Sequence, residues 1–438
     1  MCSLIRNKMT NSNNFSARSL ALESLVALER DGRYSNIEID SRIRRANLSD
    51  ADRGLYTRLV YGVTERRITL DYIISRFSET PIDALDEDVK TALRLGIYQL
   101  SFMDRIPEHA AVSETVDLVR KARRGFVNAV LRSYIRAGKP ICLPDRDDDR
   151  IKYLSVKYSV PTGLAEHFSR SYGEDEAESL LRAMAQEPKV SLRINTLKIS
   201  AENALLKTGG TMSCIADGII LVDGLDERVR DGIDAGEWFV QDEASRAATV
   251  LLGAKAGETV VDTCACPGGK SFSAAIDMEN TGRIYSFDLH RNKLSLIEKG
   301  AEKLGISIIE TSERDARKPD ESLLGRADRV LCDAPCSGLG VIAKKPDIRY
   351  KNLDEIKKLP EIQYAVLCGA AEYVRDGGVL VYSTCTLNPD ENENTVTKFL
   401  SEHGDFSLDS MKTFFPHRDG CDGFFAARMI KHTGNKND

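Results

Sequence analysis

Residues 257–271, with the sequence GETVVDTCACPGGKS, constrain the fold of this chain more than any other stretch. Residues 259–261 are β-branched and apolar and lead into Asp262, which predicts a short buried strand. Small residues follow, and residues 270–276 have the pattern of a helix. A strand, a tight turn and a helix in this order allow backbone N–H groups to approach a ligand at the carboxyl end of a parallel strand.

The alternation of strand and helix continues to the C-terminus. Predicted strands cover residues 259–262, 283–288, 306–310, 328–332 and 378–383. Predicted helices cover residues 270–278, 290–304, 354–375 and 389–402. This alternation predicts an α/β domain with a doubly wound, mostly parallel sheet, to which 406–408 and 424–430 would add edge strands.

The N-terminal part is helical in pattern throughout, and apolar residues recur there at helical spacing. One helix is predicted from about residue 110 to residue 123, and another at 126–135. A proline-containing, acidic linker follows, and then a mixed region with a helical stretch broken at Gly173 and a strand at 190–195. We therefore predict four segments: a disordered tail (1–14), an all-α domain (15–140), a linker with a small α/β subdomain (141–235) and the α/β domain (236–438).

The charge balance argues against a protein that binds polyanions through its overall charge. The chain has 61 Lys and Arg against 67 Asp and Glu, for a net charge of −6. A protein that binds RNA with this balance needs local basic patches. Such patches occur at Arg42, Arg44 and Arg45, at Arg66 and Arg67, at Arg120, Lys121, Arg123 and Arg124, and at Lys344 and Lys345. Any one of them, taken alone, is more simply a solvated helix face.

Ten cysteines without a secretory signal argue against a disulfide framework. Four of them (Cys264, Cys266, Cys332 and Cys336) lie near predicted strand ends, which raises the alternative of a zinc site. Their spacing lacks the C-x-x-C pairs of common zinc sites, so no metal is predicted. No apolar run is long enough to span a membrane, and residues 1–14 lack a signal-peptide core. We expect a cytoplasmic protein with no membrane partner.

Two later motifs give residues 257–271 their meaning. They are DAPCSGLG at 333–340 and YSTCTLNPDENE at 382–393. Together the three motifs resemble the RNA cytosine-C5 methyltransferase family, which uses S-adenosylmethionine. The segments 52–67, 93–100 and 125–132 resemble the RNA-binding antitermination factor NusB, and a NusB-like domain precedes the methyltransferase in the group that modifies 16S ribosomal RNA. The resemblance thus implies a NusB-like RNA-binding domain followed by a methyltransferase fold.

The resemblance also implies where S-adenosylmethionine would bind. An acidic residue at the end of the second strand, Asp288, suits the two ribose hydroxyls, and Asp315 after the third strand suits the adenine amino group. Either aspartate could instead cap the helix that follows it. The full set of implied cofactor contacts is Cys264, Ala265, Cys266, Pro267, Gly268, Gly269, Lys270, Asp288, Asp315 and Asp333.

Methylation of cytosine at carbon 5 requires a nucleophile from the protein, because carbon 5 gains enough electron density only after a thiolate adds to carbon 6. Cys336 and Cys385 follow adjacent predicted strands, so both thiols are expected at one edge of the sheet. DNA cytosine methyltransferases use the cysteine of the motif at 333–340, whereas the RNA family uses that of the motif at 382–393. The resemblance therefore favours Cys385 as nucleophile, Cys336 in breakdown of the adduct, and Asp333 as the contact to N3 of the base.

The expected partner is 16S ribosomal RNA, with the target base in a loop or junction where unstacking costs less. Transfer RNA as substrate, or a ribosome-assembly factor that has lost catalysis, are the alternatives. No obligate protein partner is evident. Candidate RNA contacts are Arg193, Lys344, Lys345 and Arg349. An ordinary charge at the end of a strand is an equal alternative for Arg193.

Overall fold

The structure is a computed structural model, and it describes residues 16–31, 35–46 and 48–432. The predicted tail at 1–14 lies outside the described residues. The chain divides into two compact units. The N-terminal unit runs to Arg170 and includes residues 345–350; the C-terminal unit comprises residues 171–344 and the chain from Lys351 onward.

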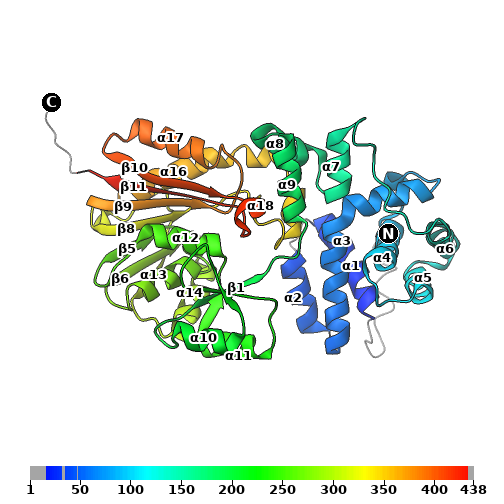
Figure 1. Cartoon of the computed structure of the whole chain (residues 1–438), viewed down its shortest axis with the longest axis horizontal. Coiled ribbons are helices and arrows are strands. Elements are labelled where there is room, and N and C mark those ends of the chain that lie inside the picture. The colour runs from blue at the N-terminus through cyan, green and yellow to red at the C-terminus, as the bar shows by residue number, and fades with distance from the viewer. Residues whose placement is uncertain (1–15, 32–34, 47, 433–438) are drawn as a thin grey trace. The chain divides into compact units, whose positions relative to one another are not determined.

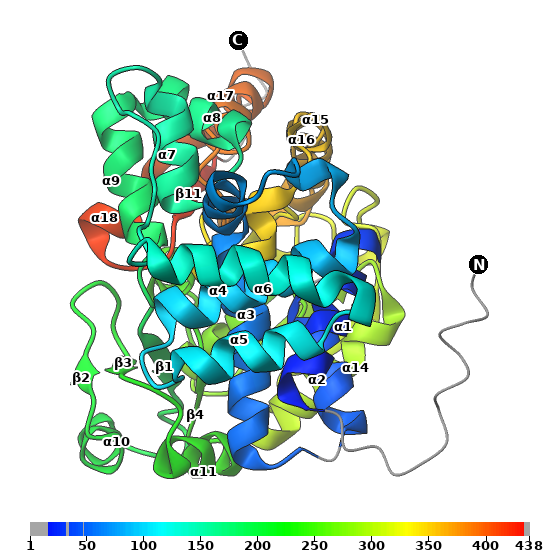
Figure 2. The ribbon, with the colours of Figure 1, turned by 90° about the vertical axis from the view of Figure 1, so that its right-hand side faces the viewer.

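The N-terminal unit is built from helices. Its elements are α1 (Ala17–Asp31), α2 (Ser35–Arg45), α3 (Asp50–Phe77), the short 3-10 helix η2 (Ile82–Ala84), α4 (Glu87–Phe102), α5 (Glu108–Asp117), α6 (Lys121–Arg136) and α7 (Arg150–Tyr158). Figure 2 shows α4, α5 and α6 side by side, with α3 crossing them. The two helices predicted at about 110–123 and 126–135 are present as α5 and α6, but the break between them lies at 118–120 rather than at 124–125. The chain turns between α5 and α6, where it buries Val119 in the core.

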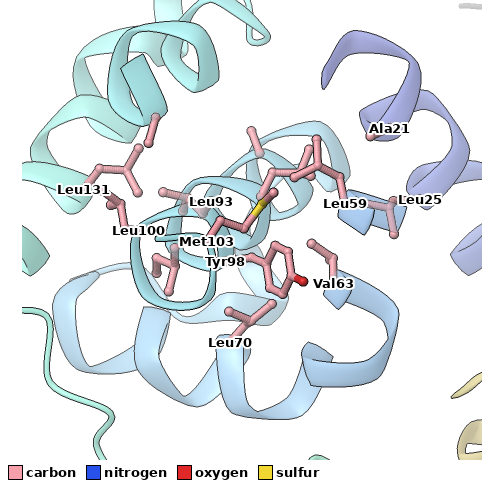
Figure 3. Close-up of a cluster of buried hydrophobic side chains, with 14 of the residues drawn as sticks. Ala21, Leu25, Leu59, Val63, Leu70, Leu93, Tyr98, Leu100, Met103 and Leu131 are labelled. Atoms are coloured by element: carbon pink, nitrogen blue, oxygen red, sulfur yellow. The ribbon is translucent and has the colours of Figure 1, made fainter. Parts of the chain in front are cut away.

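The core of the N-terminal unit consists of apolar side chains at helical spacing. Leu59 and Leu93 are fully buried, as their spacing predicts. Figure 3 shows the ring of Tyr98 between Val63 and Leu70. A glycine on α3 makes room for this ring, because a Cβ at Gly62 would lie 2.0 Å from the ring carbon Cζ of Tyr98. Close packing of this kind stabilises the helical unit against unfolding.

Helix α3 is kinked at Arg66, where φ is −107° and ψ is 15°. The kink diverts the carbonyl groups of Thr64 and Glu65 from their usual partners within the helix. Two side chains of the short 3-10 helix η4 (Pro346–Tyr350) bind these carbonyls instead. The Tyr350 hydroxyl donates to Thr64 O at 2.8 Å, and Nη1 of Arg349 donates to Glu65 O at 2.6 Å.

The C-terminal unit begins within α8 (Thr162–Tyr172), which starts in the N-terminal unit, and continues with α9 (Glu174–Met184). The predicted helix break is confirmed, since Gly173 precedes α9 with a φ of +87°. A small antiparallel sheet with strand order β2-β3-β1-β4 follows. Its elements are β1 (Val190–Ile194), α10 (Ala201–Thr208), β2 (Thr211–Met212), β3 (Ile219–Val222), α11 (Glu227–Ala235) and β4 (Trp238–Val240).

The large sheet has the strand order β10-β11-β9-β8-β5-β6-β7. The five strands from β9 to β7 in this order are parallel, and β10 and β11 are antiparallel to their neighbours. Helices α16 and α17 cover one face of the sheet, and α12, α13 and α14 cover the other (Figure 1). The strands are β5 (Thr259–Asp262), β6 (Arg283–Asp288), β7 (Ile309–Glu313), β8 (Ala327–Asp333), β9 (Val374–Thr384), β10 (Phe406–Phe414) and β11 (Phe424–Lys431).

The helices of this unit are α12 (Glu243–Leu252), α13 (Gly269–Asp277), α14 (Arg291–Leu304), α15 (Leu353–Ile356), α16 (Leu359–Ala371), α17 (Glu393–Glu402) and α18 (Pro416–Asp419), with a further 3-10 turn, η3 (Glu321–Leu323). The doubly wound sheet is confirmed, but three predicted elements need correction. The third strand lies at 309–313 rather than 306–310. The helix predicted at 354–375 is two helices. The chain at 424–431 is an inner strand, since it pairs with both β9 and β10.

None of the described helices is both long enough and apolar enough to cross a membrane.

Candidate active site at the carboxyl ends of the parallel strands

The acidic residues predicted at the strand ends lie at one edge of the large sheet. The pairing register sets Asp262 on β5 opposite Ser286 on β6, and Asp333 on β8 opposite Ser383 on β9. Neighbouring parallel strands bring their carboxyl ends together, so a ligand at this edge can contact side chains from several strands. The structure therefore assembles in space what the sequence distributes over more than a hundred residues.

The turn after β5 leaves the N-terminus of α13 open to a ligand. Its N-cap residue, Gly268, has a φ of +112° and offers no side-chain cap. A Cβ there would also lie 2.4 Å from the ring of Phe272. The first N–H groups of α13 are thus uncapped by a side chain and carry the positive end of the helix dipole, which suits a carboxylate ligand.

Asp262, at the end of β5, is fully buried beneath this turn. Its Oδ2 accepts a hydrogen bond from the Ser271 hydroxyl at 2.6 Å, and that hydroxyl lies 2.8 Å from Ser286 Oγ. Burial, with a smaller contribution from the nearby Asp333 carboxylate, raises the pKa of Asp262 to about 7. The serine found at position 271 therefore connects the turn to the floor of the site.

The two aspartates predicted to contact the adenosyl group lie at the ends of the next two strands. Asp288 ends β6, and its Oδ1 accepts a hydrogen bond from the backbone of His290 at 2.9 Å. Asp315 binds the Arg317 guanidinium through both carboxylate oxygens, at 2.9 and 2.7 Å. Hydrogen bonds from Arg317 lower the pKa of Asp315 to about 2. Neither aspartate is the N-cap of a described helix.

Lys270 forms the charged centre of the site. Its Nζ lies 2.8 Å from Asp333 Oδ2, and the other oxygen of this carboxylate accepts a hydrogen bond from Ser383 Oγ at 2.7 Å. Burial disfavours the charge on Lys270, but the Asp333 carboxylate and a thiolate at Cys385 outweigh it and raise the pKa of the ammonium. Lys270 is therefore a cation that acts on both Asp333 and Cys385.

Cys336 and Cys385 lie together, as their positions after adjacent strands predict. Cys336 follows β8, Cys385 follows β9, and their sulfur atoms are 3.3 Å apart. A hydrogen bond to Cys385 and burial raise the pKa of the Cys336 thiol well above its ordinary value. Either sulfur could donate in this contact, and the raised pKa of Cys336 favours the arrangement in which its S–H group donates to Cys385. This arrangement gives one sulfur that can attack and one that can donate a hydrogen bond.

Sequence reasoning missed the residues that support these two loops. Glu391 belongs to the third motif but has no role assigned from sequence; its carboxylate accepts the backbone N–H of Ser337 at 2.9 Å. Gly340 donates its N–H to Cys385 O at 3.1 Å and accepts from Gly423 N at 2.9 Å. Glu391 stands among polar residues, as glutamates in exposed turns do, so the local sequence did not indicate that its side chain is buried. The glycine within the second motif was a signal that could have been used.

Two of the four predicted RNA contacts are wrong, because their guanidinium groups are buried and paired. Arg193 on β1 is 3% exposed, and its Nη2 lies 2.9 Å from Asp277 Oδ1. Arg349 is also 3% exposed and binds the backbone of α3. Lys344 is partly exposed and lies between the carboxylates of Asp242 and Asp422, at 2.6 and 2.8 Å. Lys345 is exposed, and its contact with RNA stays a prediction.

Among residues 16–31, 35–46 and 48–432, the structure contains no group of three or more His, Cys, Asp or Glu side chains that could hold a metal ion.

Comparison with known proteins identifies three regions of the chain. Residues 16–136 match the NusB family, residues 160–221 match the ferredoxin-like domain of RsmF/B-like methyltransferases, and residues 249–430 match the family of 16S rRNA methyltransferases RsmB/F. The probable ribosomal RNA small subunit methyltransferase B of Bacillus subtilis is 37% identical over 95% of this chain and 99% of its own length. The corresponding protein of Synechocystis is 36% identical, with the same coverage.

Among solved structures, a methyltransferase homologue from Pyrococcus horikoshii matches 65% of this chain and 99% of its own, with 26% identity and a TM-score of 0.58.

Proposed function

We propose that this chain, which belongs to the ribosomal RNA small subunit methyltransferase B family, methylates carbon 5 of a cytosine in 16S ribosomal RNA through a covalent bond to Cys385. It is an S-adenosylmethionine-dependent methyltransferase. The observation that carries the proposal is the pair of sulfur atoms 3.3 Å apart, next to the ion pair of Lys270 and Asp333. This set of groups fits a reaction that begins and ends with a protein thiolate.

The residues at the strand ends fit the cofactor. The uncapped N-terminus of α13 suits the carboxylate of its methionine part, and the Asp288 carboxylate at the end of β6 suits the ribose hydroxyls. Asp315 would accept the adenine amino group with a lone pair not used by Arg317. S-adenosylmethionine, when bound, supplies an electrophilic methyl group and leaves as a neutral thioether.

The chain's own residues carry the bond changes on the base. The Cys385 thiolate adds its electron pair to carbon 6 to form the S–C6 bond, and the electron pair of the C5=C6 bond makes carbon 5 nucleophilic. The ring takes up a proton from solvent at N3, and the Asp333 carboxylate accepts the hydrogen bond of that N3–H group, which stabilises the adduct. Lys270, 2.8 Å from Asp333 and also attracted to Cys385, favours the anionic form of that sulfur before attack.

Release of the product reverses the addition. Once carbon 5 carries the methyl group, it loses its proton to a base, the C5=C6 bond forms again, and the S–C6 bond breaks with both electrons on Cys385. The S–H group of Cys336 stabilises this departing thiolate, since the two sulfur atoms lie within hydrogen-bond distance. Cys336 is thus needed for breakdown of the adduct and not for its formation.

The NusB-like unit supports RNA as the substrate, and the names of the relatives specify small-subunit ribosomal RNA. The exposed Lys345 immediately precedes η4 and remains the best of the four predicted RNA contacts. Naked RNA or a partly assembled small subunit, rather than the complete ribosome, would offer a target base that can leave its stack at low cost.

The experiment that tests the proposal compares wild type, Cys385→Ala and Cys336→Ala with radiolabelled S-adenosylmethionine and unmodified 16S RNA. Methyl transfer is measured on the RNA, and protein linked to RNA is measured on a denaturing gel. We expect Cys385→Ala to transfer no methyl group and form no adduct, and Cys336→Ala to accumulate an adduct. The reverse pattern would exchange the two roles. Label on transfer RNA but not on 16S RNA would overturn the substrate, and no label on either would favour an assembly factor without catalysis.

A further inference from the structure

Glu391 is a buried carboxylate behind the active site that the reaction above does not use. Its side chain is inaccessible to solvent. One oxygen accepts hydrogen bonds from Ser337 N at 2.9 Å and Gln363 Nε2 at 2.8 Å, and the other accepts from Asn388 Nδ2 at 3.0 Å. All three donors are uncharged, and in the described part of the chain no Lys, Arg or His forms an ion pair with Glu391. These three N–H dipoles stabilise the carboxylate of Glu391.

The hydrogen bonds of Glu391 join it to the Cys336 loop. Ser337 directly follows Cys336, and Gln363, on α16, donates from the same amide nitrogen to Pro335 O at 3.0 Å. The loop is also tied to the Cys385 side, because Ser337 Oγ lies 2.6 Å from Thr386 Oγ1. Removing Glu391 would leave the N–H of Ser337 buried without its acceptor.

The two cysteines thus have neighbours of opposite charge. The positive charge of Lys270 interacts with Cys385. The charges that interact with Cys336 are the negative carboxylates of Glu391 and Asp333. Tyr382 also faces Cys336, and its hydroxyl donates to Glu391 O at 2.6 Å. The Lys351 ammonium donates to Ser337 O at 2.7 Å, so a cation also contacts this loop. The carboxylates add to the hydrogen bond from Cys385 and to burial in raising the pKa of Cys336.

We propose that Glu391 is a positioning residue that holds the Cys336 loop through Ser337 and, by its buried negative charge, keeps the proton of the cysteine pair on Cys336. The proposal rests on the proposed function, in which Cys385 attacks as the thiolate. Two identical thiols in contact would otherwise share one proton without preference. The buried carboxylate on one side and the ammonium of Lys270 on the other decide which sulfur is the nucleophile.

The test measures the reactivity of the Cys336 thiol directly, without RNA or cofactor. A Cys385→Ser background removes the neighbouring thiolate, and the rate of alkylation of Cys336 by iodoacetamide is followed against pH by mass spectrometry of its peptide. In this background we expect an alkylation midpoint above the ordinary cysteine value of about 8.5. Adding Glu391→Gln should shift the midpoint to lower pH and increase the alkylation rate at pH 8 at least threefold.

A matched control is Asp390→Asn, which removes the same charge from the adjacent, exposed residue; Asp390 pairs with Asn394 at the surface. It should leave the midpoint unchanged. Glu391→Asp, which keeps the charge, should restore the alkylation rate at pH 8 to within a factor of two of the rate in the Cys385→Ser protein. An unchanged midpoint in a folded Glu391→Gln protein would overturn the proposal. If that variant does not fold, a midpoint at or below about 8.5 in the Cys385→Ser protein overturns it by itself.

The same variant in the protein with Cys385 intact gives a second readout. We expect Glu391→Gln to lower kcat at least tenfold while KM for RNA changes less than twofold, because the substrate surface is untouched. Failure of the proposed function is distinguishable: a wild type that makes no 5-methylcytosine overturns the reaction while the alkylation result stands. A wild type that methylates RNA but shows no dependence of Cys336 on Glu391 overturns only this inference.

Discussion

The sulfur atoms of Cys336 and Cys385 lie 3.3 Å apart, although 49 positions separate the residues in the chain. Each cysteine sits in the loop after one of two neighbouring parallel strands, so the register of β8 and β9 sets this distance. The pair is asymmetric, because Lys270 acts on Cys385 and Glu391 acts on Cys336.

Removal of the Lys270 ammonium should make Cys385 less reactive. Without this cation, the anionic form of the Cys385 sulfur loses a favourable interaction worth about tenfold in its population. We expect Lys270→Met to reduce alkylation of Cys385 by iodoacetamide at pH 7.5 about tenfold, and methyl transfer about 100-fold. Lys357→Met is a control, since Lys357 is 75% exposed and pairs with the similarly exposed Asp354. Equal alkylation rates in all three proteins would contradict the prediction.

Gly340 is expected to tolerate no side chain. A Cβ at this position would lie 1.8 Å from Gly423 O, and its backbone binds both Gly423 and Cys385. Gly340→Ala should displace the loop between the cysteines and reduce methyl transfer about 100-fold, since a shift of about 1 Å near reacting groups has that effect. Gly404→Ala, where a Cβ meets nothing within 4 Å, should leave transfer unchanged. Full activity of the Gly340 variant would show that the loop can move without cost.

Asp262 predicts a specific pH dependence of stability. Its pKa is raised from 3.8 to about 7 in the folded protein, so the folded state holds a proton that the unfolded state releases. The contribution of Asp262 to the free energy of unfolding therefore falls as pH rises from about 4 to about 7, and it is constant outside this window. Relative to Asp262→Asn, wild type should lose up to a few kcal/mol across the window, measured by urea denaturation without cofactor. A constant difference between pH 4 and pH 8 would refute the shift.

Arg349 should contribute to stability and not to RNA affinity. Its buried guanidinium binds Glu65 O at 2.6 Å and Ser159 O at 3.3 Å, both within the N-terminal unit. Arg349→Ala leaves these carbonyls unpaired and should lower the free energy of unfolding by about 1–3 kcal/mol. The folded variant should bind RNA within twofold of wild type. Lys345→Ala should show the opposite behaviour, with weaker RNA binding and unchanged thermal denaturation.

Arg94 should be essential to the helical core of the N-terminal unit. It is 4% exposed and binds Asp71 at 2.5 and 2.7 Å and Glu29 at 2.8 Å. Arg94→Met would leave these carboxylates without their buried partner, so we expect a loss of about 3–5 kcal/mol in chemical denaturation. The exposed Arg53, which lies 3.4 Å from Asp50, serves for comparison. Arg53→Ala should change stability by less than about 1 kcal/mol, and an equal effect would contradict the role of burial.

Local pattern was sufficient wherever a segment's own residues decide its structure. Strands 259–262 and 283–288 were predictable because β-branched or aromatic residues lead to an acidic residue followed by a turn. The helix break at Gly173 was predictable because glycine adopts the positive φ found there. The third parallel strand was misplaced by three residues, because residues 306–313 alternate too weakly to define a boundary without knowledge of the β6 partner.

The partners of the charged side chains were not predictable from local pattern. Arg193 binds the Asp277 carboxylate, 84 positions away in the chain, and Arg349 binds the Glu65 carbonyl, 284 positions away. In the sequence alone, both arginines therefore look like surface charges. The residue types at the strand ends, the two cysteines and the order of the elements were determined by the sequence alone. Only the tertiary structure decided which charge faces which thiol, because electrostatic environment depends on distances between elements that the sequence keeps far apart.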